Sequence, residues 1–209
     1  RQRLQRELAE KTREIHLLKD QQVKYPPYVE QALKAIREAI PAADPKILCD
    51  YVEVVDARWQ MAIEGYMGGA RFGIMVEPEW EAEAIRTVRN MRSDRHSKAR
   101  IIQCIKAARD AERTHCPPNS IIELMAFSHS IAADYLKVSY GSVVQVPDAD
   151  ALKTTARGLT ADGMASGNYA MWRCDLSEAE LVFGKSARQR ALKAKELELE
   201  RLILAVREA

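Results

Sequence analysis

Residues 51–76, YVEVVDARWQMAIEGYMGGARFGIMV, carry the first clear structural pattern of the chain. Residues 51–55 are rich in β-branched and aromatic side chains, which favours a strand. A helix around Trp59 follows and ends at a double glycine, and residues 71–76 form a second apolar strand. Short strands that alternate with helices over short connections indicate an α/β fold.

The same order of elements occurs twice. After residue 76, Pro78 begins a helix, and residues 100–105 complete the first unit as a strand. A second unit follows at an offset of about seventy residues. Its strands are expected at residues 121–125, 143–146 and 169–174, with helices between them. The sequence therefore predicts a globule of two pseudo-repeated β/α half-domains.

Both ends of the chain have the pattern of a coiled coil. Residues 1–22 contain no glycine or proline, and apolar residues recur at heptad positions except at Lys11. Residues 185–209 repeat this pattern, with Lys195 at the exceptional position. We expect the chain to enter on one helix and to leave antiparallel on the other. The alternative at either end is an amphipathic surface helix.

These patterns predict four segments. They are an incoming coiled-coil arm (residues 1–22), a first half (23–116), a second half (117–184) and a returning arm (185–209). The chain starts at Arg1, already inside a helical pattern, so we expect it to be a fragment of a longer protein.

Composition narrows the class of protein. Hydrophobic residues make up 47% of the chain and charged residues 30%, as in soluble globular proteins. No apolar run is long enough for a membrane helix, so no membrane partner is expected. The net charge of +2 does not by itself demand a nucleic-acid partner. The four cysteines are scattered, which favours reduced thiols in a cytosolic protein and disfavours zinc. We expect no metal and no cofactor.

The order of coil, paired half-domains and returning coil resembles the hinge of SMC proteins. Residues 50–68 resemble the first hinge half, and residues 132–146 resemble the second. The exit, residues 182–188 (VFGKSAR), is similar to the hinge-to-coil junction of MukB-type condensins. The large, tryptophan-containing first half is most similar to the JetC subunit of Wadjet plasmid-defence complexes, and next to MksB-type condensins.

This resemblance implies a function outside catalysis. It implies a homodimer joined through its hinges, whose distant ATPase heads drive DNA loop extrusion in chromosome organisation or plasmid restriction. Other subunits of the complex would bind through regions outside this chain. The implied location is the cytoplasm, in association with the nucleoid, and the chain itself is not expected to be an enzyme.

Glycines next to the predicted strands are candidates for the dimer interface. A glycine beside a strand often marks close approach of another backbone, although an ordinary turn explains each one singly. Phe72, Tyr169 and Trp172 are apolar anchors in this interpretation, or else core residues. The predicted interface comprises Gly68, Gly69, Phe72, Gly73, Gly163, Gly167, Tyr169 and Trp172.

A basic run is a candidate for weak, sequence-independent contact with DNA phosphates. It comprises Arg86, Arg89, Arg92, Arg95, Lys98 and Arg100. The alternative is a solvated helix and loop.

The sequence gives little evidence for catalytic residues. His115-Cys116 and Ser128-His129 are only neighbours in sequence, and geometry in space decides whether such pairs react. A small ligand-binding or enzymatic α/β domain inserted in a coiled-coil protein is the rival hypothesis. A coiled-coil apex joined by zinc is a third, opposed by the lack of a Cys-x-x-Cys pair.

Overall fold

The computed structural model describes residues 2–19, 24–91 and 98–208. Its helices are α1 (Gln2–Lys19), α2 (Pro27–Ala39), α3 (Gln60–Met67), α4 (Glu81–Arg89), α5 (Cys104–Ala111), α6 (Ser130–Tyr140), α7 (Ala149–Leu152) and α8 (Lys185–Glu208). Its strands are β1 (Lys46–Ile47), β2 (Val52–Val54), β3 (Ile74–Met75), β4 (Met125–Phe127), β5 (Val144–Gln145), β6 (Gly158–Leu159), β7 (Met164–Gly167) and β8 (Ala170–Arg173).

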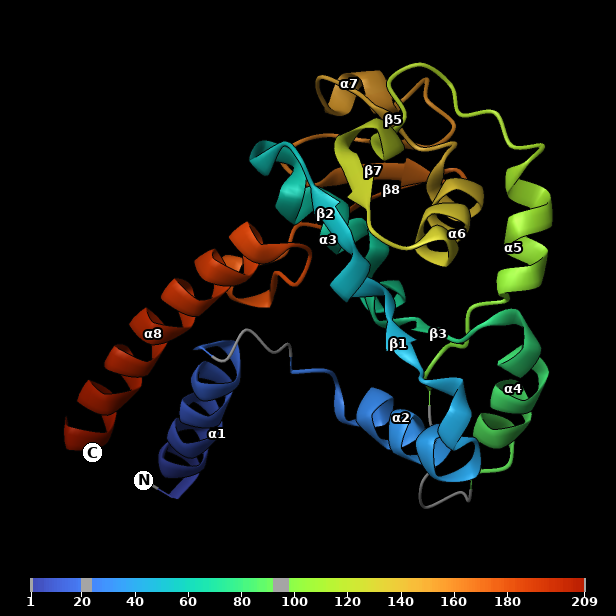
Figure 1. The fold of residues 1–209 in the computed structure, drawn as a ribbon. Coiled ribbons are helices and arrows are strands. Elements are labelled where there is room, and N and C mark those ends of the chain that lie inside the picture. The colour runs from blue at the N-terminus through green and yellow to red at the C-terminus, as the bar shows by residue number, and fades with distance from the viewer. Residues whose placement is uncertain (1, 20–23, 92–97, 209) are drawn as a thin grey trace.

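The two terminal helices form an antiparallel pair that projects from the globule. α1 runs towards the globule and α8 runs away from it, so that both chain ends lie together at the free end of the pair (Figure 1). Lys11 lies 2.6 Å from Glu198, and Lys195 lies 2.8 Å from Glu14. The two lysines that interrupt the heptads therefore form ion pairs between the helices. The expected antiparallel pair is confirmed.

The two halves of the globule repeat a 3-10 helix, a strand and a helix. In the first half these are η2 (Leu48–Tyr51), β2 and α3, and in the second they are η7 (Ile121–Leu124), β4 and α6. β2 and β4 pair antiparallel, with Val52 opposite Phe127 and Val54 opposite Met125. The pairing of corresponding strands joins the halves, and their buried side chains belong to one core.

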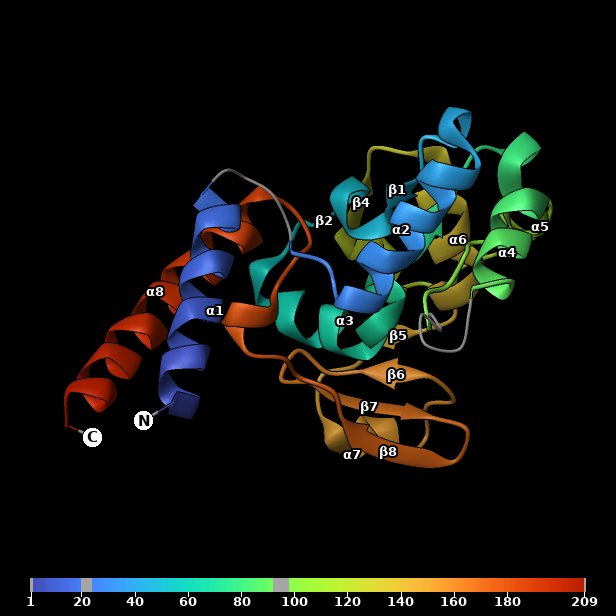
Figure 2. The ribbon, with the colours of Figure 1, turned by 90° about the horizontal axis from the view of Figure 1, so that it is seen from below.

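The sheets are small, and the second half has the larger one. β1 pairs with β3, and a single parallel bridge joins Ile74 of β3 to Ile101. In the second half β5 pairs parallel with β6, and β7 and β8 extend this sheet antiparallel in the order β5-β6-β7-β8. This sheet forms one side of the globule, with β8 at its margin (Figure 2).

Several predicted strands are wrong in extent or type. The strand at residues 100–105 is reduced to the bridge at Ile101, because α5 begins at Cys104. Ile102, Cys104 and Ala107 are buried. The Glu81 carboxylate accepts a hydrogen bond of 3.0 Å from the Ile105 amide, and this bond stabilises the start of α5. Residues 68–72 and 121–124 are 3-10 helices, so the strands expected there are short. β1, β6 and β7 were not predicted.

The part of the chain that the structure describes contains no helix long and apolar enough to cross a membrane.

Candidate functional site

β8 is the outer strand of the four-stranded sheet, and all four of its residues are exposed. Its register with β7 runs from Gly167 opposite Ala170 to Met164 opposite Arg173. Among the described residues, no strand pairs with its other side. An unpaired edge exposes backbone donors and acceptors that another chain can bind.

The direction of these backbone groups follows from the hairpin. Asn168 and Tyr169 form its two-residue turn, with φ values of 48° and 61° as a type I′ turn requires. The Cys174 amide donates to the Gly163 carbonyl at 2.8 Å, towards the β7 side. Because these groups alternate along a strand, the amides and carbonyls of Met171 and Arg173 point to the open side.

Apolar side chains accompany the open edge. Tyr169 is 110% exposed, Met171 is 43% exposed and Trp172 is 39% exposed. Tyr169 has a positive φ, a conformation that costs a residue with a Cβ about 1 kcal/mol. Tyr169 is thus a fully exposed aromatic residue in an unfavourable backbone conformation, at the tip of a hairpin.

β8 and the residue directly after it contact α3 at two points. The rings of Trp172 and Tyr66 stack with centroids 5.9 Å apart and an angle of 21° between their planes. Gly65 lies so close to the end of β8 that an added Cβ would be 1.4 Å from the Cys174 carbonyl oxygen. Only a glycine allows this approach.

A buried carboxylate holds the segment directly before α8. Glu64 is 0% exposed, and its two oxygens accept the backbone amides of Val182 at 2.8 Å and Phe183 at 3.2 Å. Arg71 and Gln60 also donate to Glu64, at 3.0 and 2.7 Å. A charge without water is stable only when its hydrogen-bonding capacity is filled in this way.

A second carboxylate ties the incoming chain to the start of α8. Asp50 accepts hydrogen bonds from the Tyr25 hydroxyl and, at 2.6 Å, from Arg188. Burial raises the pKa of Tyr25, and the hydrogen bond to Asp50 raises it further, so the phenol stays protonated as a donor. We call Tyr25, Asp50, Glu64, Arg71 and Arg188, together with the segment 180–183, the arm root.

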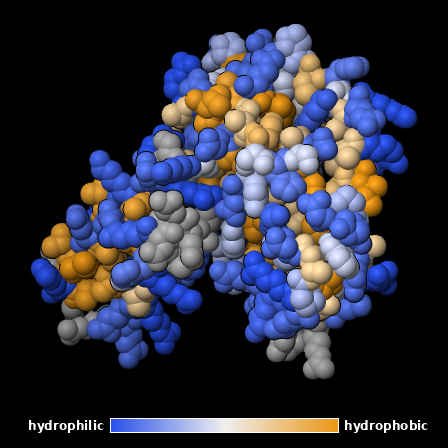
Figure 3. Space-filling view, in the orientation of Figure 1, coloured by the Kyte–Doolittle hydropathy of each residue, from blue (hydrophilic) through white to orange (hydrophobic). Residues whose placement is uncertain are grey.

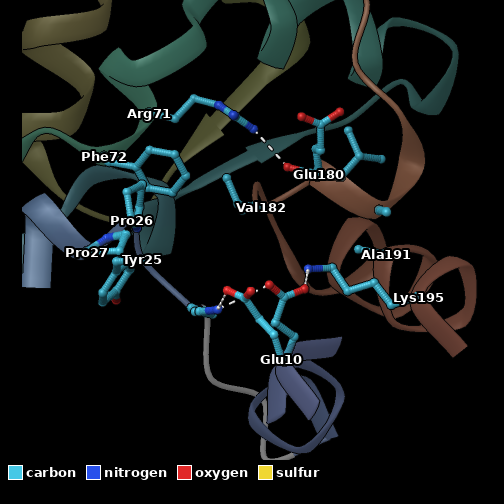
Figure 4. A pocket seen from close by; sticks show the side chains of 14 residues that line it. Glu10, Tyr25, Pro26, Pro27, Arg71, Phe72, Glu180, Val182, Ala191 and Lys195 are labelled. Carbon is cyan, nitrogen blue, oxygen red and sulfur yellow. Dashed lines mark hydrogen bonds and ion pairs between the residues drawn. The ribbon is translucent and has the colours of Figure 1, made fainter. Parts of the chain in front are cut away.

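A cavity of about 360 Å³ lies at the arm root, between the incoming and outgoing chains. Figure 4 shows Arg71 bonded to the Glu180 carbonyl on one side, and the acid–lysine pairs of α1 and α8 on the other. Lys24 also contacts Glu10 and Glu14 there. On the side of the helix pair, the charged side chains that line the cavity therefore pair with one another.

No protein-family model and no curated protein sequence matches the chain. Solved structures do match. The SMC hinge domain of Geobacillus stearothermophilus, crystallised as an asymmetric dimer, has a TM-score of 0.57 and 19% identity, over 99% of this chain and 88% of that one. The chain has the fold of an SMC hinge domain. The Smc5/6 hinge domain of S. pombe has a TM-score of 0.50 and 11% identity, over 99% of this chain and 90% of that one.

A third match is to part of a much longer chain. A structure of the folded elbow of cohesin has a TM-score of 0.55 and 12% identity, over 98% of this chain and 30% of that one. At these identities the likeness shows the fold alone. The narrower similarity to MukB-like proteins and JetC stays a prediction.

In this hinge fold the eight predicted interface residues fall into two groups. Gly68, Gly69, Phe72 and Gly73 lie on or directly after η4 (Gly68–Phe72), where Phe72 belongs to the hydrophobic core. Gly163, Gly167, Tyr169 and Trp172 lie on the β7–β8 hairpin or next to it. Within the second group, Trp172 lies on the edge strand β8 and Tyr169 in the turn before it, whereas Gly163 and Gly167 flank or belong to the inner strand β7. Contact between copies remains a prediction for all eight.

The predicted basic run is described in part. Arg86 and Arg89 lie in the last turn of α4, and Lys98 and Arg100 lie between α4 and α5; all four are exposed. Arg92 and Arg95 lie outside the described residues. DNA contact by this run stays a prediction.

The sequence analysis missed Met171 and the acids of the arm root, Asp50 and Glu64. A signal for Glu64 was present, because it sits in the apolar face of α3 beside Ile63 and Met67. Arg71 interrupts an apolar segment in the same way, seven residues further on. Two opposite charges inside apolar patterns indicate a buried pair.

The described residues offer little for metal or thiol chemistry. Among them, no three His, Cys, Asp or Glu side chains gather as a metal-binding group. Burial raises the pKa of Cys174 to about 11, and burial together with a hydrogen bond to Glu81 raises that of Cys104 to about 12. Both thiols are therefore protonated at neutral pH and are poor nucleophiles.

Proposed function

We propose that the chain is the homodimerisation hinge of an SMC-like ATPase, and that a second copy covers the β8 edge. The observation that carries the proposal is β8 itself: an unpaired strand with outward backbone groups and exposed Tyr169, Met171 and Trp172. Adding a strand to such an edge satisfies its donors and acceptors and buries the apolar side chains. The hinge fold and the dimeric crystal of the Geobacillus stearothermophilus hinge support it.

The antiparallel arms support the same proposal. They place the globule at the tip of a rod, where a dimer contact joins two rods. α8 keeps an apolar face away from α1, since Leu197 is 52% exposed and Leu204 is 57% exposed, and Figure 3 shows hydrophobic side chains over this outer part of the arm. In this proposal ATP hydrolysis belongs to head domains outside the chain, and the chain carries no catalytic step.

The finer assignment follows the resemblance to MukB-like proteins. In it the dimer acts in the cytoplasm, associated with the nucleoid, in DNA loop extrusion. In a JetC-type complex the outcome is restriction of plasmid DNA, and in an MksB-type complex it is chromosome organisation.

Met171→Pro tests the proposed edge. Proline removes one amide that points to the open side, so the bonds between β7 and β8 remain while strand addition is blocked. Met171→Ala is the matched control, because it shortens the same side chain and keeps the amide. We expect the dimer dissociation constant of Met171→Pro to be at least about tenfold higher than that of Met171→Ala. This factor corresponds to a loss of about 1.4 kcal/mol of binding free energy.

Sedimentation equilibrium measures both dissociation constants, and circular dichroism checks that the variants are folded. Equal dissociation constants for two folded variants would show that copies do not add at β8.

Weak DNA contact is a second element of the proposal, favoured by the exposure of Arg86, Arg89, Lys98 and Arg100. Such binding should be indifferent to DNA sequence and should weaken steadily as salt rises. A salt titration of binding to random-sequence duplex DNA checks this.

The rival hypothesis of a ligand-binding domain has less support. A hollow of about 680 Å³ lies beside the β7–β8 hairpin. The hydroxyl groups of Thr154, Thr155 and Ser166, which line it, already donate to backbone carbonyls. A recognition pocket needs polar groups that converge on the ligand. Thermal stabilisation by a nucleotide or metabolite would favour the rival.

A further inference from the structure

One turn of α3 contacts both the β8 edge and the arm root. Successive residues of a helix are rotated by about 100°, so Glu64, Gly65 and Tyr66 face different neighbours. Glu64 faces the segment directly before α8, whereas Gly65 and Tyr66 face β8. The candidate dimer edge and the start of the outgoing arm are thus separated by a single helical turn.

The contact between α3 and the end of β8 is too close to allow relative movement. Cys174, at the end of the strand, lies against Gly65 at a distance that no Cβ could occupy. Its sulfur also lies 3.9 Å from the Ala62 carbonyl oxygen. Trp172 stacks on Tyr66, which itself meets Tyr140 edge to face at 5.9 Å. Because no space separates Gly65 from the Cys174 backbone, a displacement of the end of β8 towards α3 displaces α3 with it.

The contact between α3 and the arm root is equally stiff, for a different reason. Glu64 is wholly buried, and Val182 and Phe183 supply two of the four hydrogen bonds to its carboxylate. Losing either amide leaves a buried charge short of a donor, which costs more than an ordinary hydrogen bond is worth. The segment 182–183 therefore follows α3, and α8 begins only two residues later, at Lys185.

We infer that α3 couples the β8 edge to the direction of α8, with Glu64, Gly65 and Tyr66 as its positioning residues. Whatever covers β8 sets the position of α3, and α3 sets the root of the outgoing arm. The inference rests on the proposed function in one respect, namely that a second copy of the chain is what covers β8. Since coupling between two sites is reciprocal, the position of the arm also biases dimer affinity.

Amide hydrogen exchange at Val182 and Phe183 reads the coupling, because both amides donate to Glu64. The variants are Trp172→Ala and Tyr66→Ala, each of which removes one ring of the stack in the full chain. We expect either variant to raise exchange at both amides at least about tenfold, through local opening of the arm root.

A matched control isolates the effect. Tyr66→Phe keeps the stacked ring and loses only the hydroxyl, which accepts a long hydrogen bond of 3.4 Å from Arg157. This variant should exchange as the wild type does. The amides of Val55 and Ser128, which bond to Leu124 and Tyr51 between the halves, serve as reference.

Protection at Val182 and Phe183 that is unchanged in Trp172→Ala and Tyr66→Ala overturns the inference. So does a rise that the reference amides share, because it reports general destabilisation. Light scattering on the same samples separates this test from that of the proposed function. A monomeric wild type would contradict dimerisation, yet a selective rise at the arm root would still support coupling through α3.

Discussion

Glu64 and Arg71 form the buried ion pair at the centre of the arm root, with side chains 0% and 8% exposed and a distance of 3.0 Å. Burying two charges costs desolvation free energy, which their attraction offsets only when the geometry is good and further hydrogen bonds are made. Here the geometry fixes two backbone amides before α8 and, through Arg71, the Glu180 carbonyl. The pair therefore orients the exit of the chain.

Arg71→Met should lower the free energy of unfolding by about 3–5 kcal/mol, because it leaves the Glu64 charge buried without its cation. Adding Glu64→Gln to this variant removes the charge, so the double variant should lose less than the sum of the single losses. Chemical denaturation measures all three. A loss below about 1 kcal/mol for Arg71→Met would mean that the pair behaves as an exposed one.

Tyr169 shows that the sequence alone could not predict which aromatic residues are exposed. The sequence offered it as an anchor or a core residue, and the structure places it at the exposed tip of a type I′ turn. Phe72, which was offered in the same terms, is a core residue. Both are aromatic residues close to glycines, so only the tertiary structure separates them.

At the globular end of the helix pair α1 and α8, ion pairs lie beside buried apolar side chains such as Ile15 and Ala191. Glu14 is 17% exposed and contacts Lys195 and Lys24. Burial raises the pKa of its carboxyl, but the hydrogen bonds and charges of Lys195 and Lys24 outweigh burial and hold the pKa below its ordinary value of 4.5. The ionised form thus stabilises the folded arm.

Because the folded pKa of Glu14 is depressed, its contribution is present above about pH 4.5 and is lost as the pH falls through the folded value. We expect Glu14→Gln to cost about 1 kcal/mol at neutral pH, with the difference from wild type vanishing in acid. Thermal unfolding at several pH values checks this. Glu10→Gln, at a carboxylate that is 68% exposed, is the control and should cost less. A difference that persists unchanged in acid would contradict the role given to Glu14.

Elements with long periodic patterns could be predicted from the sequence, and short ones could not. The heptads of α1 and α8 extend over several turns, and α3 and α6 each present a recognisable apolar face. By contrast, the run around Ile101 and Cys104 suits a strand or a helix start equally well, and Glu81, far away in sequence, decides for the helix. β6 and β7 contain small residues such as Gly158 and Gly167. The sequence analysis placed Gly167 in the candidate dimer interface, with an ordinary turn as the alternative, and expected no strand here.

Gly158 explains why that stretch forms strands. An added Cβ there would lie 2.8 Å from a Leu152 methyl group, so the small residue allows close packing of β6 against α7. Packing of this kind depends on partners distant in sequence and leaves no local pattern.

The chain as one body consists of two joined halves with an arm pair at one end and an open sheet edge at another (Figures 1 and 2). The sequence predicted the halves and the arms. It did not predict that the second half carries a longer sheet than the first, because β7 and β8 have no counterpart after the bridge at Ile101. This extension is what provides the candidate dimer edge.

The solution mass of the chain over a wide range of concentrations tests the central claim most directly. Light scattering should give the mass of two chains of 23.6 kDa each, with dissociation only on strong dilution. Loss of the dimer in Met171→Pro but not in Met171→Ala would place the contact at β8. A single-chain mass at every concentration, for a chain shown to be folded, would contradict the account.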